Sequence, residues 1–145
     1  MVDVGRKSVT ARRAVARGRV FMRPATLALL ESGGSRKGNV LATAHLAGVM
    51  AAKRTSEIIP LAHALPLDSV HVTFAIDRAH ASVEIESRVS TRARTGVEME
   101  ALTAVAAAAL TIYDMLKAVD RGMMLGEIAL WEKRGGRSGL YRRRA

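Results

Sequence analysis

Asp114 and Lys117 lie three residues apart in the stretch IYDMLK, so a helix would place both side chains on one face, within reach of each other. One interpretation is an ordinary surface ion pair, which contributes only about 0.3–0.5 kcal/mol to stability. The other is a proton-transfer pair, in which each group and its burial tune the pKa of the other. Apolar neighbours surround the charges and favour a buried acid/base pair: Ile112, Tyr113, Met115 and Leu116.

Two basic loops contain glycine and could bind an anion. GGSRKGN, residues 33–39, leads into a predicted helix, so its backbone N–H groups and Lys37 could form a phosphate cradle. The loop lacks the G-x-x-x-x-G-K-[ST] pattern of a P-loop. EKRGGRSG, residues 132–139, is similar in character. Together with the acid/base pair, these loops favour chemistry on a phosphorylated small molecule.

His63 lies between Pro60 and Pro66 in EIIPLAHALPL, where regular helix is excluded and a stiff loop is expected. It could be a functional histidine held on that loop or an ordinary structural one. The four histidines show no close metal-ligand spacing, and the chain has no cysteine. We therefore expect no zinc site, and disulfides and cysteine nucleophiles are excluded. The cations Lys53 and Arg54 suit the end of the preceding helix without any further role.

The composition indicates a single globular domain with anionic partners. The chain has 145 residues and is 49% hydrophobic, and its 23 Lys and Arg against 13 Asp and Glu give a net charge of +10. Much of the basic charge lies near the two ends, where it could also be a solubilising surface on frayed tails. Thr103, Thr111 and Asp114 interrupt the most apolar run, residues 101–116, and no signal peptide is recognisable. We expect a cytoplasmic protein with no membrane partner.

Periodicity predicts the elements that must position these groups. Apolar and polar residues alternate over residues 69–77 and 81–90, which predicts an antiparallel hairpin. Further strands are predicted at 18–23 and at 124–133, the latter with Ile128 and Leu130 facing inward. Helices are predicted at 24–32, 39–55 and 97–118. The result is an α+β antiparallel sheet of about four strands with helices packed on one face.

The longest predicted helix is rich in alanine, which leaves a smooth surface that a neighbouring element can approach closely. A helix of this kind is buried on more than one side, and in a small domain the second side often comes from another subunit. We therefore expect an oligomer. Lys37 lies on a loop and Asp114 near the end of this helix, so we further expect these two residues to meet between neighbouring chains.

Four segments, in order along the chain, resemble the cyclic pyranopterin monophosphate synthase family, also known as the molybdenum cofactor biosynthesis protein C family. They are MVDV, KGNVLATAHLAGVMAAKRTSEIIPLAHALPL, TGVEMEALTAVAAAALTIYDMLKAVDRGM and EKRGGRSG. The resemblance covers nearly the whole chain and implies one ferredoxin-like α+β domain over residues 1–145. It also implies a homohexamer, a trimer of dimers with active sites at the dimer interface.

The resemblance implies the reaction as well. A cyclised dihydro-GTP, made by a preceding radical enzyme, is rearranged into cyclic pyranopterin monophosphate with release of pyrophosphate. The implied enzyme is a lyase of molybdenum cofactor biosynthesis that requires no cofactor, although Mg²⁺ could accompany the triphosphate. Basic loops would then neutralise the phosphates.

Position by position, the resemblance places the catalytic aspartate at Asp114 and its lysine partner at Lys117, with Lys37 and His63 as further catalytic residues. We expect cations such as Lys37 to hold phosphates, while Asp114, Lys117 and His63 move protons. Substrate contacts fall on Leu61, Ala62, His63, Met99, Glu100, Glu98, Lys53 and Arg12. The chain departs from the family pattern at Asn39, Ala62, Ala64 and Leu116, where Asp, Cys, Pro and Cys are usual.

Two alternatives remain beside this interpretation. The net charge and the terminal YRRRA suggest a nucleic-acid-binding module. Only 3% of the residues are aromatic, which leaves little for base stacking, so we expect no specific nucleic-acid partner. An inactive relative of the enzymes is the other alternative, and the presence of both Asp114 and Lys117 argues against it.

Overall fold

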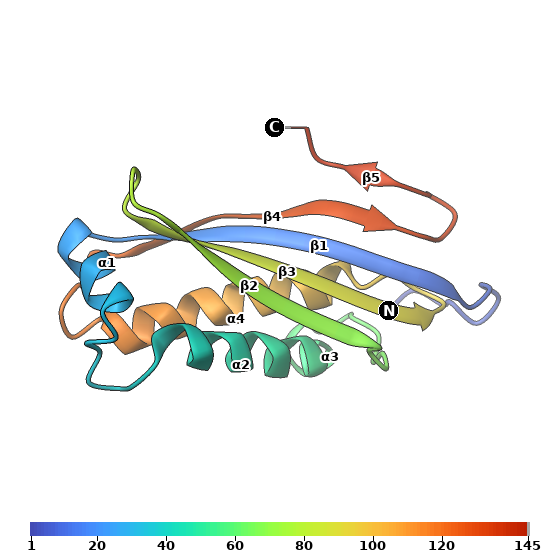
Figure 1. Cartoon of the computed structure of the whole chain (residues 1–145). Helices are drawn as coiled ribbons and strands as arrows, with labels where there is room; N and C mark the ends of the chain where they lie inside the picture. Colours follow the sequence, from blue (N-terminus) through green and yellow to red (C-terminus); the bar gives the residue numbers. More distant parts are fainter. Residues whose placement is uncertain (145) are drawn as a thin grey trace.

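A computed structural model describes residues 1–144 as one five-stranded antiparallel sheet with helices on one face (Figure 1). The strands are β1 Thr10–Phe21, β2 Ser69–Asp77, β3 Ser82–Ala93, β4 Met124–Arg134 and β5 Tyr141–Arg142. The helices are α1 Pro24–Glu31, α2 Val40–Lys53, α3 Thr55–Ile58 and α4 Glu98–Leu116. The predicted hairpin and the three longer helices are confirmed, whereas the short α3 and β5 were not predicted.

The strand order β2-β3-β1-β4-β5 defines the topology. Helices α1 to α3 connect β1 to β2, and α4 connects β3 to β4. This βαββαβ arrangement, with β1 and β3 at the centre, is the ferredoxin-like fold. The prediction of about four strands is therefore confirmed for the main sheet. The two-residue β5 pairs only with Glu132 and Lys133 of β4 and extends the edge.

Strand β1 begins eight residues before the predicted strand at 18–23 and ends at Phe21. Its helix-facing positions are small, such as Ala14 and Ala16, and these residues are fully buried. Arginines occupy the opposite face, for example Arg13 and Arg17. This alternation of small and charged residues lacks the large apolar side chains that mark a typical strand. The arginines at positions 12, 13, 17 and 19 are consequently fixed on a central strand, and the frayed-tail interpretation is wrong for them.

The core lies between the sheet and the layer formed by α2 and α4 (Figure 1). Alanines and aliphatic residues of α4 pack on β1 and β3, and its other side packs on α2. Gly48 of α2 permits this close approach, because a Cβ at Gly48 would lie 3.0 Å from the carbonyl oxygen of Ala104. The second buried side of the alanine-rich helix α4 is thus covered by α2 of the same chain. The alanine-rich surface by itself therefore does not require another subunit.

Helix α4 is long and apolar enough to span a membrane by length and composition, but half of its most apolar window is buried inside the domain. It serves as the core helix. At the sheet edge, Leu130 packs against the core as predicted. Ile128 also lies on the helix-facing side, because its Cγ1 and that of Val105 both lie where a Cβ on Gly18 would point, but it is 40% exposed beside a β-bulge at which Glu127 has a φ of 55°. The short β5 does not pair with this part of β4.

Candidate functional site

The C-terminal end of α4 carries a three-residue ion cluster, which we call the Asp114 cluster: Lys37, Asp114 and Lys117. The Nζ of Lys117 lies 2.8 Å from Oδ1 of Asp114, and the Nζ of Lys37 lies 2.7 Å from Oδ2. Lys37 also donates to the carbonyl oxygen of Asp114 at 3.0 Å. Each carboxylate oxygen therefore holds one ammonium group, and Asp114 keeps two lysines together.

This cluster is open to solvent, contrary to the expected buried pair. The side chain of Asp114 is 54% exposed, and both lysines are exposed to a similar degree. Its apolar neighbours in sequence, including Met115 and Leu116, point into the core instead. Hydrogen bonds from Lys117 and then Lys37 lower the pKa of Asp114 to about 2, and the carboxylate in turn raises the pKa of Lys117. Burial acts in the opposite direction on the pKa of Asp114, and the hydrogen bonds outweigh it.

The loop between α1 and α2 brings Lys37 to this position within one chain. Gly33 and Gly38 adopt positive φ angles of 72° and 99°, which glycine tolerates without strain. Ser35 donates to the carbonyl oxygen of Met115 at 3.3 Å and so fastens the loop to the end of α4. The expectation that Lys37 and Asp114 meet only between neighbouring chains is therefore wrong.

The N-terminal end of α4 carries a second group, which we call the Glu100 cluster: Glu100, His63, Glu98 and Arg12. Glu100 is only 4% exposed. Burial raises its pKa, as does the nearby charge of Glu98, while a backbone hydrogen bond and, to a smaller extent, His63 partly offset the shift. The Nε2 of His63 lies 2.8 Å from the carbonyl oxygen of Val2 in the N-terminal segment. A carboxyl group that is reluctant to ionise is suited to donate a proton.

Arg12 lies against the glycine loop of residues 132–139, at the edge of a hollow of about 780 Å³. Gly135 and Gly136 have positive φ angles, and a Cβ at Gly136 would clash with the guanidinium group of Arg12. Arg12 donates to the carbonyl oxygen of Arg94 at 3.2 Å, whereas its Nε is buried without a partner in the described chain. The hollow is lined by Arg6, Lys7, Ser8, Thr10, Arg12, Thr95, Gly96, Glu98, Lys133, Gly136, Arg137 and Ser138.

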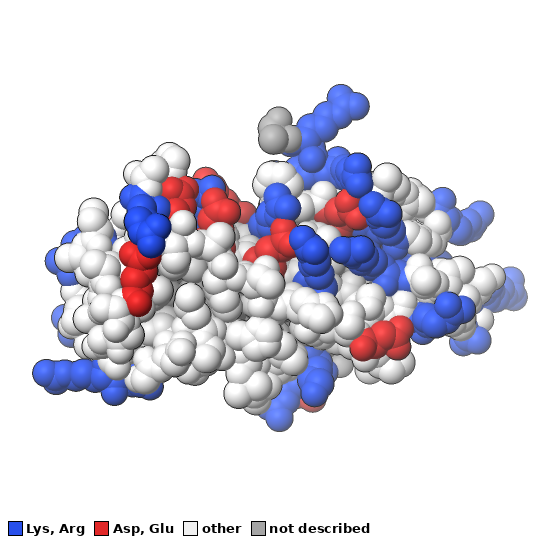
Figure 2. All heavy atoms as spheres, in the orientation of Figure 1, with Lys and Arg blue, Asp and Glu red and all other residues white. Residues whose placement is uncertain are grey.

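Helix α2 runs antiparallel to α4, so Lys53, its last residue, lies at the same end as the Glu100 cluster. Leu61 is exposed, and Ala62 is half-buried, on the loop that carries His63. Met99, in the first turn of α4, is 38% exposed. Figure 2 shows Lys and Arg side chains crowded over the half of the molecule where β4, β5 and the start of β1 lie.

The predicted site residues therefore fall into two groups at opposite ends of one rigid helix. Glu100 and Asp114 are fourteen residues apart on α4, which at a rise of 1.5 Å per residue separates them by roughly 21 Å. One chain assembles Lys37, Asp114 and Lys117 and, separately, the residues around Glu100. It does not bring the two groups together.

The sequence model of the MoaC family matches residues 1–136, a range that contains both clusters. The chain belongs to the MoaC family. Relatives named cyclic pyranopterin monophosphate synthase occur in Thermomicrobium roseum, at 62% identity over 143 residues, 99% of this chain and 86% of the relative. The one from Chloroflexus aggregans is also 62% identical, over 99% of this chain and 87% of the relative. That from Parvibaculum lavamentivorans is 55% identical, over 98% and 89% respectively.

Sequence reasoning did not identify Arg6, Lys7 and Arg137 as neighbours of Arg12, although all three line the hollow. The only available signal was the basic character of both ends of the chain, which left a solubilising surface equally open. Within residues 1–144, no group of three or more His, Asp or Glu side chains is placed to hold a metal ion.

Proposed function

We propose that this chain is a lyase of molybdenum cofactor biosynthesis that converts a cyclised dihydro-GTP into cyclic pyranopterin monophosphate and pyrophosphate. The observation that carries the proposal is the 62% identity to synthases over 99% of the chain, a span that includes both charged clusters. The chemistry of the clusters supports the same reaction, because one is rich in cations and the other contains a carboxyl group with a raised pKa.

In this proposal, the two lysines of the Asp114 cluster neutralise the phosphates. Asp114 holds their Nζ atoms beside its own carboxylate before substrate arrives. A charge-assisted hydrogen bond to phosphate is strong, and cations placed in advance need little reorganisation as the pyrophosphate charge develops. When phosphate recruits Lys37, Asp114 loses one of the two cations that hold its pKa near 2 and becomes a better proton acceptor.

The Glu100 cluster would handle the opposite part of the substrate. Glu100 is the group best suited to donate a proton, because burial favours its protonated form and raises its pKa. His63, on its loop, and the main chain of Leu61 and Ala62 would contact the ring system. Arg12 and Lys53 add positive charge at this end, and in a site shared by two chains they would supplement the phosphate contacts made by the Asp114 cluster of the other chain.

The proposed site joins the Asp114 cluster of one chain to the Glu100 cluster of another. The separation of roughly 21 Å along α4 is the reason, since no side chain at one end reaches the other. A homohexamer, built as a trimer of dimers with sites at the dimer interface, satisfies this requirement. We further propose a cytoplasmic location and no resident cofactor, and any Mg²⁺ would be bound by oxygens of the triphosphate.

The test supplies purified protein with the cyclised dihydro-GTP and measures pyrophosphate together with the fluorescent pterin formed after oxidation. The two products should appear in equal amounts, and GTP should give neither. If the folded protein formed neither product from the cyclised substrate, the proposed function would be wrong.

A further inference from the structure

Asp120 is a buried carboxylate in the turn between α4 and β4, and no role described above involves it. Its side chain is only 4% exposed. Oδ2 accepts hydrogen bonds from the main-chain N–H of Arg23 at 3.0 Å and from the hydroxyl of Thr26 at 2.9 Å. Oδ1 accepts one from the N–H of Gly122 at 3.1 Å. Asp120 thus joins the turn after α4 to the start of α1.

Helix α1 depends on this carboxylate because it lacks an N-terminal cap of its own. Arg23 occupies the N-cap position, but its side chain makes no capping hydrogen bond, and no acidic residue lies in the first turn. An anion at the N-terminus of a helix accepts free N–H groups and is favoured by the helix dipole. The guanidinium group of Arg23 also donates to the carbonyl oxygen of Val119. Asp120 and Val119 therefore hold the start of α1 from a distant part of the sequence, through the N–H and guanidinium groups of Arg23 and the hydroxyl of Thr26.

The segment that begins at Arg23 ends at Lys37, and this second end also contacts the C-terminal end of α4. After α1, the hydroxyl of Ser35 donates to the carbonyl oxygen of Met115 and accepts the N–H of Lys37, each at 3.3 Å. Lys37 then reaches Asp114. Residues 23–37 are consequently fastened at both ends to residues 114–120, by Asp120 at one end and by Lys37 with Ser35 at the other.

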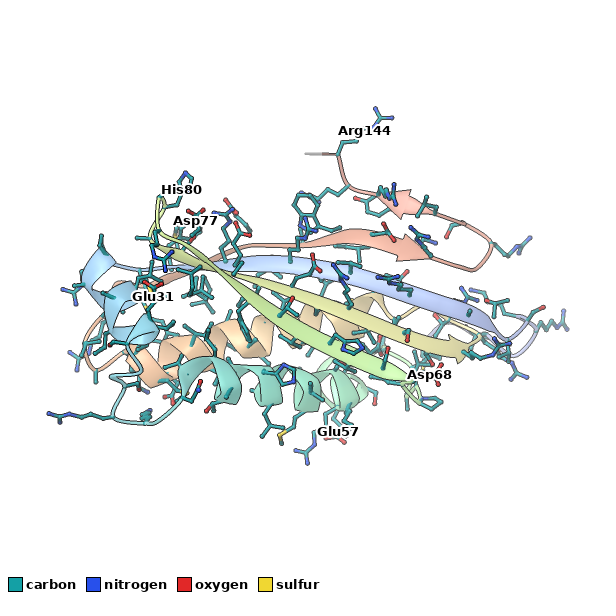
Figure 3. All side chains as sticks on the ribbon, viewed as in Figure 1. Glu31, Glu57, Asp68, Asp77, His80 and Arg144 are labelled. Atoms are coloured by element: carbon teal, nitrogen blue, oxygen red, sulfur yellow. The ribbon has the colours of Figure 1, made fainter. Side chains whose placement is uncertain are left out.

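Other contacts of α1 restrain it less directly. Leu27 and Leu30 anchor one side of the helix in the core. Glu31, at its C-terminal end, pairs with Arg78 of the β2–β3 hairpin, and Figure 3 shows Glu31 close to that hairpin. Apolar packing is not directional, so it specifies the position of the helix along its axis less sharply than hydrogen bonds do. Two hydrogen bonds tie the start of α1 to Asp120, because the N–H of Arg23 and the hydroxyl of Thr26 both donate to Oδ2. The N–H of Gly122 holds the carboxylate itself in its own turn.

We propose that Asp120 is a positioning residue for phosphate binding: by clamping the start of α1, it determines where Lys37 stands beside Asp114. The inference relies on the proposed function only for the identity of the ligand, the pyrophosphate portion of the substrate. Because Asp120 is too buried to contact substrate, it would act only through Lys37.

The test compares Asp120→Ala, Lys37→Ala and the double variant in the full chain, using inorganic pyrophosphate as the binding probe and the cyclised dihydro-GTP for turnover. Asp120→Ala should raise the pyrophosphate Kd and the substrate KM by roughly tenfold and leave kcat within about threefold, as expected for a misplaced binding group. Added to Lys37→Ala, it should have no further effect on Kd, because Asp120 acts on pyrophosphate only through Lys37, which is then absent. Asp120→Asn keeps one acceptor oxygen, so its pyrophosphate Kd should lie much closer to the wild-type value than that of Asp120→Ala.

A matched control separates positioning from general stability. Ser87→Ala removes another buried hydrogen bond, to the carbonyl oxygen of Ala101, far along α4 from Lys37, and should lower the melting temperature without changing Kd. If Asp120→Ala does not fold, Thr26→Val is judged by the same criteria, since it keeps the shape and removes one donor to Asp120.

A drop in kcat and melting temperature with unchanged KM and Kd would overturn the inference, because a smaller folded fraction has that effect. Independent, multiplying effects of Asp120→Ala and Lys37→Ala would overturn it too. If the wild-type chain neither bound pyrophosphate nor turned over substrate, the proposed function would fail, and the inference with it.

Discussion

Two inactive variants of this chain should restore activity when they are mixed, provided that they damage opposite ends of α4. Lys37→Ala disables the Asp114 cluster, because it removes one of the two cations on that carboxylate. Glu100→Gln disables the other cluster, because the amide cannot release a proton as the buried carboxyl group can. Each variant alone should be inactive, since every site would lack one half.

The magnitude follows from the separation of the two clusters along one helix. If each site takes its Asp114 cluster from one chain and its Glu100 cluster from another, an equal mixture has half of each kind intact. Random exchange then gives about one site in four with two intact halves, whatever the symmetry of the oligomer. Activity should recover to about a quarter of the wild-type value, measured as pyrophosphate release after correction for the separate variants.

A second mixture provides the control. Lys37→Ala and Asp114→Asn both damage the Asp114 cluster, and these residues are in contact within one chain. Every cluster in that mixture is therefore defective, and activity should not return. Persistent inactivity of the first mixture would refute the reasoning if mass spectrometry confirmed that mixed oligomers had formed. Recovery in the second mixture would show that Lys37 and Asp114 act from different chains after all.

Three further predictions follow from individual environments. Lys37→Ala should raise the pKa of Asp114 above its value of about 2, as a carbon NMR titration would show, and an unchanged pKa would mean that Lys117 alone controls it. Glu100→Gln should make the chain more resistant to urea at neutral pH. The pKa of Glu100 is raised in the folded state, so the wild-type chain loses stability as pH rises from the ordinary glutamate pKa through the folded-state value, and the amide does not. Equal urea unfolding curves for the two chains over that pH range would contradict this. Gly48→Val should reduce the free energy of unfolding by roughly 2–3 kcal/mol by overpacking the contact with Ala104, whereas a neutral change would show that α2 can move away.

The elements could be predicted from sequence where apolar residues followed a clear period. The hairpin of β2 and β3 alternates aliphatic with polar residues, and the structure places both strands close to the predicted bounds. Strand β1 could not be fully predicted, because its buried positions hold Ala14, Ala16 and Gly18, and residues this small give little hydrophobic signal. Its neighbours on both sides supply the pairing that fixes it as a strand.

The candidate site was predictable as a set of residues but not as an arrangement. The three-residue spacing of Asp114 and Lys117 indicated their contact, which the structure confirms. Lys37 is distant in sequence, and its contact with Asp114 depends on glycine turns and on Ser35, which have no recognisable pattern. The separation of the site residues into two groups could have been predicted from the helix length, since Glu100 and Asp114 are fourteen residues apart and their side chains cannot meet along one helix.

The environments of the two carboxylates explain why separating them could serve the proposed reaction. Asp114 is exposed and paired with two cations, so it remains ionised, whereas Glu100 is buried and resists ionisation. Carboxyl groups whose pKa values are shifted in opposite directions can act as base and acid at one pH. The rigid helix keeps Glu100 too far from Asp114 to pass its proton to that carboxylate within one chain. Both environments are therefore preserved until two chains meet. In this proposal, association of chains completes the acid/base pair that each chain holds apart, so oligomer formation is a requirement of the chemistry itself.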